Sequence, residues 1–468
     1  MTDYSMADKI IFFGLLVGIF LAAIDATVVS VAMPKVVSSL GGVGIYSWVF
    51  TAYILASTIS GPLWGRLSDI YGRRVIYITG VNLFIIGSVL CGLSTDMTQL
   101  VIFRALQGLG AGSVLVLTFT LIGELYRLEE RARITGYTTT VWALASITGP
   151  PMGGFIVDSI DWRWVFFINI PFGLLAVAIA WRNLKRGKGE VRGLDITGTV
   201  LFSITSTTLL IYLNEYNNLG LLGPIMLLLS LATVPAFIYV ERHASNPLIP
   251  LHLFKDKVLR GGYLGNLAAG FIFFGAIAYM PLYLQWALRL SATSSGLALL
   301  PITLGWVLSA NLSAKLVVNM GPKPLAIASG LALIIGNAAI VVTSGNLILL
   351  LPSLALLGLG MGFTVSTFLI TTQTIVSRDV LGVATSLLSF LRLLGGAVSA
   401  VVMWIPLSGV IGSVEQLSPT TTPTLTAEQV AAFTAAISQS FLIALAAAVS
   451  TLIIYILTPS IMLKGKPS

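Results

Sequence analysis

The chain has 468 residues, of which 56% are hydrophobic and only 9% are charged. Soluble globular domains carry about 25% charged residues, so this composition excludes a soluble protein. The formal net charge of +8 could suggest a nucleic-acid partner, but the positions of the basic residues give another explanation. Cys91, inside an apolar run, is the single cysteine, so no intramolecular disulfide can form.

Apolar runs long enough to cross a hydrocarbon core of about 30 Å recur along the whole sequence. The first run is too long for the apolar part of a signal peptide and has no small-residue cleavage site, so it is expected to be retained. Hydropathy and length predict fourteen spanning helices. Their approximate limits are 10–33, 46–66, 75–94, 99–122, 134–157, 164–182, 194–213, 219–240, 261–286, 293–317, 323–343, 346–375, 382–406 and 438–461.

The basic residues predict the orientation of these helices. With the N-terminus in the cytoplasm, nearly all of the 26 lysines and arginines fall in cytoplasmic segments. The exceptions are Lys35, Arg163 and Arg289 on the outer side, and Arg104 and Arg392 within spans. This asymmetry follows the positive-inside rule, and an even number of spans returns the C-terminus to the cytoplasm. The positive charge is therefore topological, and no nucleic-acid partner is expected.

Two stretches of the sequence recur at an offset of about 250 residues. The segment "GRLSDIYGRRVIYI" (65–78) is loosely matched by "AKLVVNMGPKPLAI" (314–327), and "GLGAGS" (108–113) is matched by "GLGMGF" (358–363). A chance match of short glycine-rich strings is the alternative. The agreement of the two offsets favours a duplicated half, and parallel repeats of this kind place a substrate site between the halves.

This repeat predicts an all-α polytopic membrane protein with four parts. They are a six-helix bundle at 1–186, two inserted helices at 187–242, a cytoplasmic interfacial connection at 243–260 and a second six-helix bundle at 261–468. A long outer loop near 407–437 is rich in Thr and Pro and then turns helical. Its "TAEQ" (426–429) has the form of a capping box at the start of a helix.

Six motifs carry a family resemblance. The segments "GRLSDIYGRR" (65–74), "FRALQGLGAG" (103–112) and "GPPMGG" (149–154) resemble signatures of the major facilitator superfamily, and the last resembles its antiporter signature. Three others are similar to segments of its fourteen-helix drug/proton antiporter branch: "DWRWVFFINIPFG" (161–173), "NPLIPLHLF" (246–254) and "FLRLLGGAVS" (390–399). The resemblance covers nearly the whole chain. It implies a multi-pass transporter of the plasma membrane that acts as a monomer, is powered by a proton gradient and needs no cofactor or metal.

Asp25 is the clearest carboxylate inside a span, in the otherwise apolar segment 10–34. Such a charge costs ~2.5 to 3.5 kcal/mol or more near the bilayer centre. The rise of a helix puts Asp25 ~12 Å and Arg104 ~8 Å below the outer ends of their spans, so the two can meet if the helices are neighbours. An opposite charge favours the ionised carboxylate, whereas desolvation favours the neutral one. We expect Asp25 to carry proton coupling; a static ion pair is the alternative, and Arg104 either orients Asp25 or packs the helix.

A second cluster of charges is expected at the cytoplasmic side, comprising Asp69, Arg73, Arg74 and Glu124. Glu124 could accept a charge-assisted hydrogen bond from Arg73. The family resemblance suggests that such a network holds the inner side closed when the outer side opens. Topology alone explains the two arginines, but it does not require the two acids.

The residue types of the "GPPMGG" segment point first to helix packing rather than to a chemical role. Pro150 and Pro151 remove backbone donors and can bend the helix, while Gly149, Gly153 and Gly154 permit the close approach of another helix. The family resemblance favours a bendable seam that supports exchange, and a purely structural kink is the alternative.

Polar and aromatic residues within the spans could line a substrate cavity: Trp142, Phe274, Tyr279, Tyr283, Trp306, Asn311, Gln373 and Arg392. Membrane-interface belts and ordinary packing are the commoner fate of such aromatic residues. Arg392 should face a cavity or a carbonyl-lined pocket, where it either binds substrate or stabilises an unwound turn. The second half offers no acid inside a span, which favours neutral, monovalent or anionic substrates over dications.

The leading functional hypothesis is a proton-coupled antiporter that exports hydrophobic or amphipathic molecules by alternating access. A uniporter or proton symporter of a specific metabolite and a lipid flippase are the alternatives within transport. An enzyme or sensor has little support, because the two histidines form no metal-ligand cluster and the sequence has no GxxxxGK[ST] phosphate-binding loop. Small molecules, protons and the lipid bilayer are the expected partners.

Overall fold

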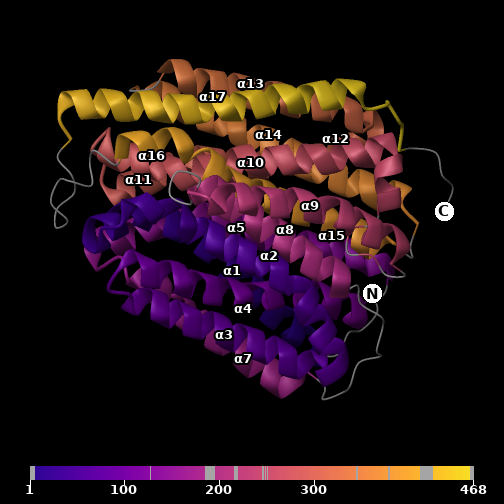
Figure 1. The fold of residues 1–468 in the computed structure, drawn as a ribbon. Helices are drawn as coiled ribbons and strands as arrows, with labels where there is room; N and C mark the ends of the chain where they lie inside the picture. The colour runs from indigo at the N-terminus through magenta and orange to yellow at the C-terminus, as the bar shows by residue number, and fades with distance from the viewer. Residues whose placement is uncertain are drawn as a thin grey trace.

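The computed structural model in Figure 1 is a bundle of roughly parallel helices. It describes residues 6–126, 128–184, 196–215, 220–244, 247, 249, 251–343, 346–377, 380–411 and 425–463. These residues contain helices and no strands. Thirteen of the described helical segments are long and apolar enough to cross a membrane, and a further apolar helix, Thr197–Leu213, is shorter. The all-α class is therefore confirmed, whereas the count of fourteen spans stays a prediction.

The first half of the bundle comprises seven helices. They are α1 (Met6–Leu40), α2 (Tyr46–Tyr71), α3 (Arg73–Leu93), α4 (Met97–Leu125), α5 (Leu128–Ser159), α6 (Trp164–Phe167) and α7 (Asn169–Asn183). The predicted span 164–182 is thus two helices that meet at Ile168. Pro171 explains the break, because proline has no N–H to continue the hydrogen bonds of a preceding helix but is tolerated in a first turn.

The remaining helices follow in two groups. The pair α8 (Ile196–Glu215) and α9 (Leu222–His243) precedes the second half, which comprises α10 (Lys257–Trp286), α11 (Ala292–Ala298), α12 (Leu300–Met320), α13 (Pro322–Thr343), α14 (Leu347–Ile375), α15 (Leu381–Val402), α16 (Ile405–Ile411) and α17 (Ala427–Leu457). The predicted span 293–317 is interrupted before Leu300, where Pro301 occupies the first turn of α12.

The end of the chain differs from the predicted limits. The last long helix begins at Ala427 rather than at 438, so the predicted outer loop at 407–437 is partly helical. The capping box is confirmed, because Thr426 accepts from the backbone of Gln429 while the Gln429 side chain accepts from the backbone of Thr426. The central part of that loop, 412–424, lies outside the described residues.

The duplicated motifs adopt matching geometry. Gly72 joins α2 to α3 with φ 93°, and Gly321 joins α12 to α13 with φ 76°, a region that favours glycine. In the second pair of motifs, Gly108 lies against the backbone of α2 and Gly358 against that of α12. A side chain at either position would collide with the neighbouring helix, so the same packing solution occurs at both copies of the repeat.

Helix α8 packs against α2 of the first half and α15 of the second, and α9 packs against α8 (Figure 1). The hydroxyls of Thr205 and Thr233 lie 2.7 Å apart between the two helices. Phe202 of α8 packs against Phe390 of α15 with ring centroids 5.2 Å apart. The opposite face of α9 is apolar and exposed, as at Leu228 (65%), which suits a surface that faces lipid.

Both chain termini lie at the same end of the bundle, which we call the terminus end (Figure 1). The opposite end, the far end, carries α11 and α16. An even number of crossings produces this arrangement, since α1 starts and α17 finishes at the terminus end.

Candidate functional site

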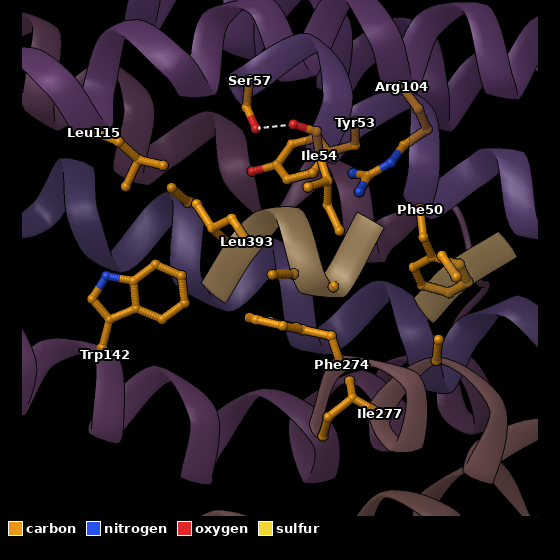
Figure 2. Close-up of a pocket in the computed structure, with 15 residues that line it drawn as sticks. Phe50, Tyr53, Ile54, Ser57, Arg104, Leu115, Trp142, Phe274, Ile277 and Leu393 are labelled. Atoms are coloured by element: carbon orange, nitrogen blue, oxygen red, sulfur yellow. Dashed lines mark hydrogen bonds between the residues drawn. The ribbon is translucent and has the colours of Figure 1, made fainter. Parts of the chain in front are cut away.

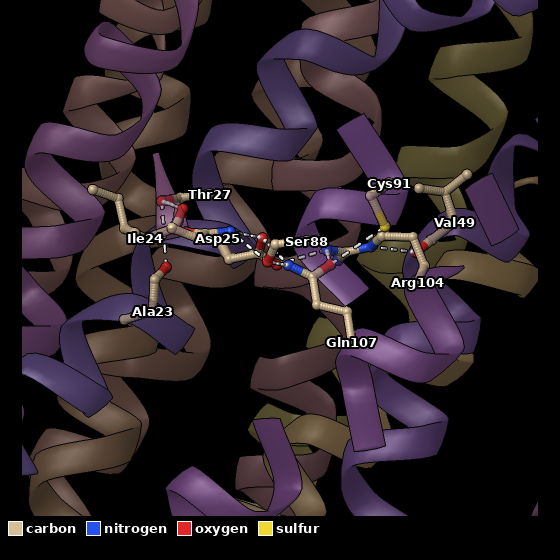
Figure 3. A network of polar contacts seen from close by, with 10 residues as sticks. Ala23, Ile24, Asp25, Thr27, Val49, Ser88, Cys91, Arg104 and Gln107 are labelled. Atoms are coloured by element: carbon tan, nitrogen blue, oxygen red, sulfur yellow. Dashed lines mark hydrogen bonds and ion pairs between the residues drawn. The ribbon is translucent and has the colours of Figure 1, made fainter. Parts of the chain in front are cut away.

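Asp25 lies in the interior of the first half, with none of its surface exposed (Figure 3). Its carboxylate accepts three hydrogen bonds: from Arg104 Nη1 to Oδ2 at 2.6 Å, from Gln107 Nε2 to Oδ1 at 2.8 Å and from Asn169 Nδ2 to Oδ1 at 2.9 Å. The carboxylate therefore acts as an acceptor only, as an ionised carboxylate does. These donors lie on α4 and α7, so one acid on α1 connects three helices.

Arg104 connects α4 to two further helices (Figure 3). In addition to Asp25, it donates through Nε to the Val49 carbonyl of α2 at 3.2 Å, and its guanidinium carbon lies 4.1 Å from the centre of the Tyr53 ring. It also donates to Gln107 Oε1 at 2.6 Å. A cation that is only 1% exposed requires an opposite charge and hydrogen-bond acceptors of this kind.

Three members of this cluster were missed by the sequence reasoning: Ser88, Gln107 and Asn169. The Ser88 hydroxyl accepts from Gln107 Nε2 at 2.7 Å and from Asn169 Nδ2 at 3.2 Å. Gln107 follows Arg104 by three residues, a spacing that puts both on one helix face. That spacing is the signal that could have found it. We call Asp25, Ser88, Arg104, Gln107 and Asn169 the Asp25 cluster.

A cavity lies beside the Asp25 cluster, between the two halves (Figure 2). It contains about 670 Å³ of atom-free space, including its open part. Arg104 is the only charged side chain among the described residues that line it, and the others are mostly apolar or aromatic. The lining comprises Ala22, Ala26, Phe50, Tyr53, Ile54, Ser57, Arg104, Leu115 and Trp142 of the first half, and Phe274, Ile277, Ala278, Leu393, Gly396 and Ala400 of the second.

Two of the eight predicted cavity residues, Trp142 and Phe274, line this cavity from opposite halves (Figure 2). The other six do not line it in this conformation. Tyr283 is buried against Phe433 of α17, with ring centroids 6.5 Å apart, and Trp306 packs edge-on against Phe273 at 5.0 Å.

Three more of the six lie apart from the cavity for different reasons. The Tyr279 hydroxyl donates to the Ala400 carbonyl, and its ring stacks on Trp404 at 5.9 Å. Asn311 is exposed and donates to the Val307 carbonyl of its own helix at 2.8 Å. Gln373 is partly buried near the end of α14.

Arg392, the last of the six, adjoins the cavity without belonging to its lining. It precedes the lining residue Leu393 and lies one helical turn before Gly396.

The charges predicted at the cytoplasmic side gather at the α2–α3 turn. Arg73 lies 2.5 Å from Asp69 through Nη1 and 2.7 Å from Glu124 of α4 through Nε. Arg74 is separate from these acids: it donates to the Leu184 carbonyl at 3.5 Å. The side chains of Arg73, Asp69 and Glu124 are 21%, 18% and 47% exposed, so solvent weakens these ion pairs.

The "GPPMGG" residues lie where the halves meet. Helix α5 continues through Pro150 and Pro151. Gly149 and Gly153 face α1, and a Cβ atom at Gly153 would lie 3.0 Å from the Val28 carbonyl oxygen.

The contact of this motif with the second half is equally close. A Cβ atom at Gly154 would collide with the backbone of Ala292 and Thr293, and the Pro150 carbonyl lies directly against Gly296. The motif therefore lets α5 and α11 touch through their backbones.

Polar contacts join the two halves at the far end. Asp158 of α5 accepts from the Thr293 N–H at 2.7 Å and from the Thr293 hydroxyl at 2.6 Å, and also from the Ala292 N–H at 3.2 Å. Gln285 donates to the Val31 carbonyl at 2.8 Å. The Tyr46 hydroxyl donates to the Ala278 carbonyl at the same distance. The halves are thus held together between the cavity and the far end.

Comparison with known proteins identifies relatives along most of the chain. Residues 15–400 match the profile of the Major Facilitator Superfamily. Multidrug transporter protein MdtP of Bacillus subtilis (strain 168) is 34% identical over 393 residues, which are 82% of this chain and 72% of the relative. Multidrug resistance protein 3 of the same organism is 31% identical over 403 residues, 84% of this chain and 78% of the relative. Multidrug efflux pump SdrM of Staphylococcus aureus (strain N315) is 30% identical over 300 residues, 62% of this chain and 65% of the relative.

Solved structures share the fold. A bacterial homolog of the human lysosomal transporter Spinster, in an inward-facing and occupied conformation, has a TM-score of 0.70 and 14% identity over 97% of each chain. A D-xylose-proton symporter has a TM-score of 0.67 and 16% identity over 98% of this chain and 99% of its own. At such identities the likeness shows the fold alone.

The family match, the related efflux proteins and the membrane-spanning helices all indicate transport rather than catalysis. The chain belongs to the Major Facilitator Superfamily and is a multi-pass membrane transporter.

Proposed function

We propose that this transporter is a proton-coupled antiporter of the plasma membrane that exports hydrophobic or amphipathic small molecules. The observation that carries this proposal is that Arg104 contacts Asp25 and also lines the cavity. The same guanidinium holds Asp25 at 2.6 Å and lines the cavity between the halves. A proton on Asp25 and a substrate in the cavity would therefore act on one side chain.

The cavity supports an amphipathic substrate. Its lining offers aromatic surfaces from both halves, at Trp142 and Phe274, and few polar groups. Pockets that are mainly apolar with a few placed polar groups suit drug-sized ligands. The printed names of MdtP, multidrug resistance protein 3 and SdrM point to the same substrate class.

Asp25 is proposed as the proton carrier. A proton there would remove the charge that faces Arg104 and would convert one acceptor oxygen into a donor. The hydrogen bonds from Gln107 and Asn169 would then have to rearrange, and these residues belong to α4 and α7. Protonation of one carboxylate can therefore change the packing of several helices of the first half.

Alternating access is proposed to occur between two six-helix halves, with α8 and α9 inserted between them in sequence. The positive-inside rule favours a cytoplasmic terminus end, which makes the closed far end the outer side. Opening outward would break the contacts of Asp158 and Gln285 between the halves. The network of Asp69, Arg73 and Glu124 joins α2, α3 and α4 within the first half, so a role in closing the inner side would require a partner from the second half.

The test is exchange in proteoliposomes that carry the full-length chain, with an internal pH indicator and a panel of aromatic amphiphiles. Substrate movement should drive an opposing proton movement, and Asp25→Asn should abolish proton movement while the protein stays folded. The matched control is Asp161→Asn, which removes a 45% exposed carboxylate and should leave exchange unchanged. Substrate movement with no proton movement, or with protons moving in the same direction, would contradict the proposal.

A further inference from the structure

Arg392 is a half-buried cation within a span, and no ion pair among the described residues balances its charge. Its Nε atom is buried and has no hydrogen-bond partner. Across the described residues, the ion pairs involve other arginines. Helix α15 is continuous from Leu381 to Val402, so there is no unwound turn for Arg392 to stabilise. Substrate binding is the other role that the sequence left open.

Arg392 lies at the edge of the central cavity. Residues four apart lie one above the other on a helix face, and Gly396 lines the cavity. Side chains in a helix lean toward its N-terminal end, which for α15 is the end nearer the termini. Arg392 is therefore next to the cavity on the side from which a cytoplasmic substrate would enter.

Arg104, which lines the cavity, and Arg392, which adjoins it, differ in how their charges are balanced. Arg104 faces Asp25 at 2.6 Å, so its charge is compensated within the protein. The only acid between Arg260 and Glu415 in the sequence is Asp379, thirteen residues before Arg392, and no described acid forms an ion pair with Arg392. An uncompensated cation at the edge of a cavity whose lining offers no acid attracts anions and repels cations.

We propose that the cavity selects amphipathic molecules that carry one anionic group, such as a carboxylate, and that Arg392 is the counter-ion of that group. This inference rests on the proposed function, because it names the substrate class of the same cavity. The guanidinium fork matches a carboxylate with two parallel hydrogen bonds, while Trp142 and Phe274 offer aromatic surface to the apolar part. In exchange, the departing anion and the entering proton both move charge in the direction that an inside-negative potential favours.

The test uses three probes that share one ring system and differ in charge: 9-anthracenecarboxylate, its methyl ester and 9-(aminomethyl)anthracene. Binding to the full-length chain is measured in lipid nanodiscs, and empty nanodiscs provide the correction for partition into lipid. Wild-type protein should bind the acid more tightly than the amine by about tenfold or more. Arg392→Gln should weaken binding of the acid by about tenfold and leave the ester within about twofold.

Two further variants separate charge from folding. Arg392→Lys keeps the charge without the fork and should retain part of the preference for the acid. Arg260→Gln removes the same charge from an exposed position on α10 and should leave all three affinities unchanged. The inference is overturned if the wild type prefers the amine, or if Arg392→Gln weakens acid and ester equally.

Different results would contradict the proposed function and this inference. If none of the probes drives proton movement in proteoliposomes, the proposed exchange is contradicted. The charge preference is then still decided by the binding measurements in nanodiscs alone. If the amine is the probe that binds best and is exchanged for protons, exchange stands and the anion selectivity is wrong.

Discussion

The carboxylate of Asp158, in the first half of the transporter, accepts hydrogen bonds from both the backbone N–H and the hydroxyl of Thr293, in the second half. A carboxylate at the start of a helix also satisfies backbone donors that have no partner within the helix. This pair therefore favours the conformation in which the far end is closed.

We predict that Asp158→Asn shifts the population toward an open far end. The amide keeps one acceptor but loses the charge, and because the site is exposed the effect should be only about 2- to 5-fold. The measurement is the rate at which a membrane-impermeant maleimide, added from outside, labels Ser57→Cys in the cavity of a Cys91→Ala background. Asp161→Asn is the control and should not change that rate. Equal labelling of Asp158→Asn and the control would show that this contact does not hold the gate.

Gln107 provides the second prediction. Gln107→Leu removes the donor to Asp25 and Ser88 and also the acceptor for Arg104. Loss of hydrogen bonds to buried charged groups costs about 1 to 3 kcal/mol, so the variant should melt earlier. It should also exchange protons for substrate more slowly, because Asp25 is no longer held in position.

The control for this change is Gln99→Leu, in the first turn of the same helix and outside the Asp25 cluster. Thermal unfolding in detergent and proton movement in proteoliposomes give the two readouts. Normal exchange by a destabilised Gln107→Leu would mean that Gln107 is structural only.

The sequence carries enough information to predict the helices, because each span must be long and apolar to cross the membrane. The meeting of Asp25 and Arg104 could also be anticipated, since a charge inside a span needs a partner and their depths are similar. Gln107 follows Arg104 by three residues on one helix face, a spacing that could have pointed to it. Asn169 could not be anticipated, because uncharged polar residues are common in spans and nothing in the sequence says which of them meet.

The cavity was predictable only in part, for a different reason. Trp142 and Tyr283 are both aromatic residues within spans, yet Trp142 lines the cavity and Tyr283 packs against α17. Which side of a helix faces the cavity depends on how the two halves dock, and that docking is set by contacts such as Gly154 against α11. The order of residues within one helix carries no information on how the two halves dock.

Two adjacent residues of α10 allow the effect of a cavity residue on ligand binding to be compared with that of a core residue. Phe274 lines the cavity, whereas Phe273 is 2% exposed and packs against Trp306. Phe274→Ala should weaken binding of an aromatic ligand by roughly 5- to 30-fold, the equivalent of about 1 to 2 kcal/mol of lost apolar contact, with little change in melting temperature.

Phe273→Ala should behave in the opposite way. Truncation of a buried phenylalanine costs about 3 to 5 kcal/mol of stability, so this variant should melt earlier while the folded fraction binds the ligand with nearly normal affinity. The measurements are thermal unfolding and equilibrium binding of the methyl ester of 9-anthracenecarboxylate, which reports apolar contact without charge. If Phe273→Ala weakened binding as strongly as Phe274→Ala, or if Phe274→Ala left binding intact, the aromatic ligand would not occupy the cavity between the halves.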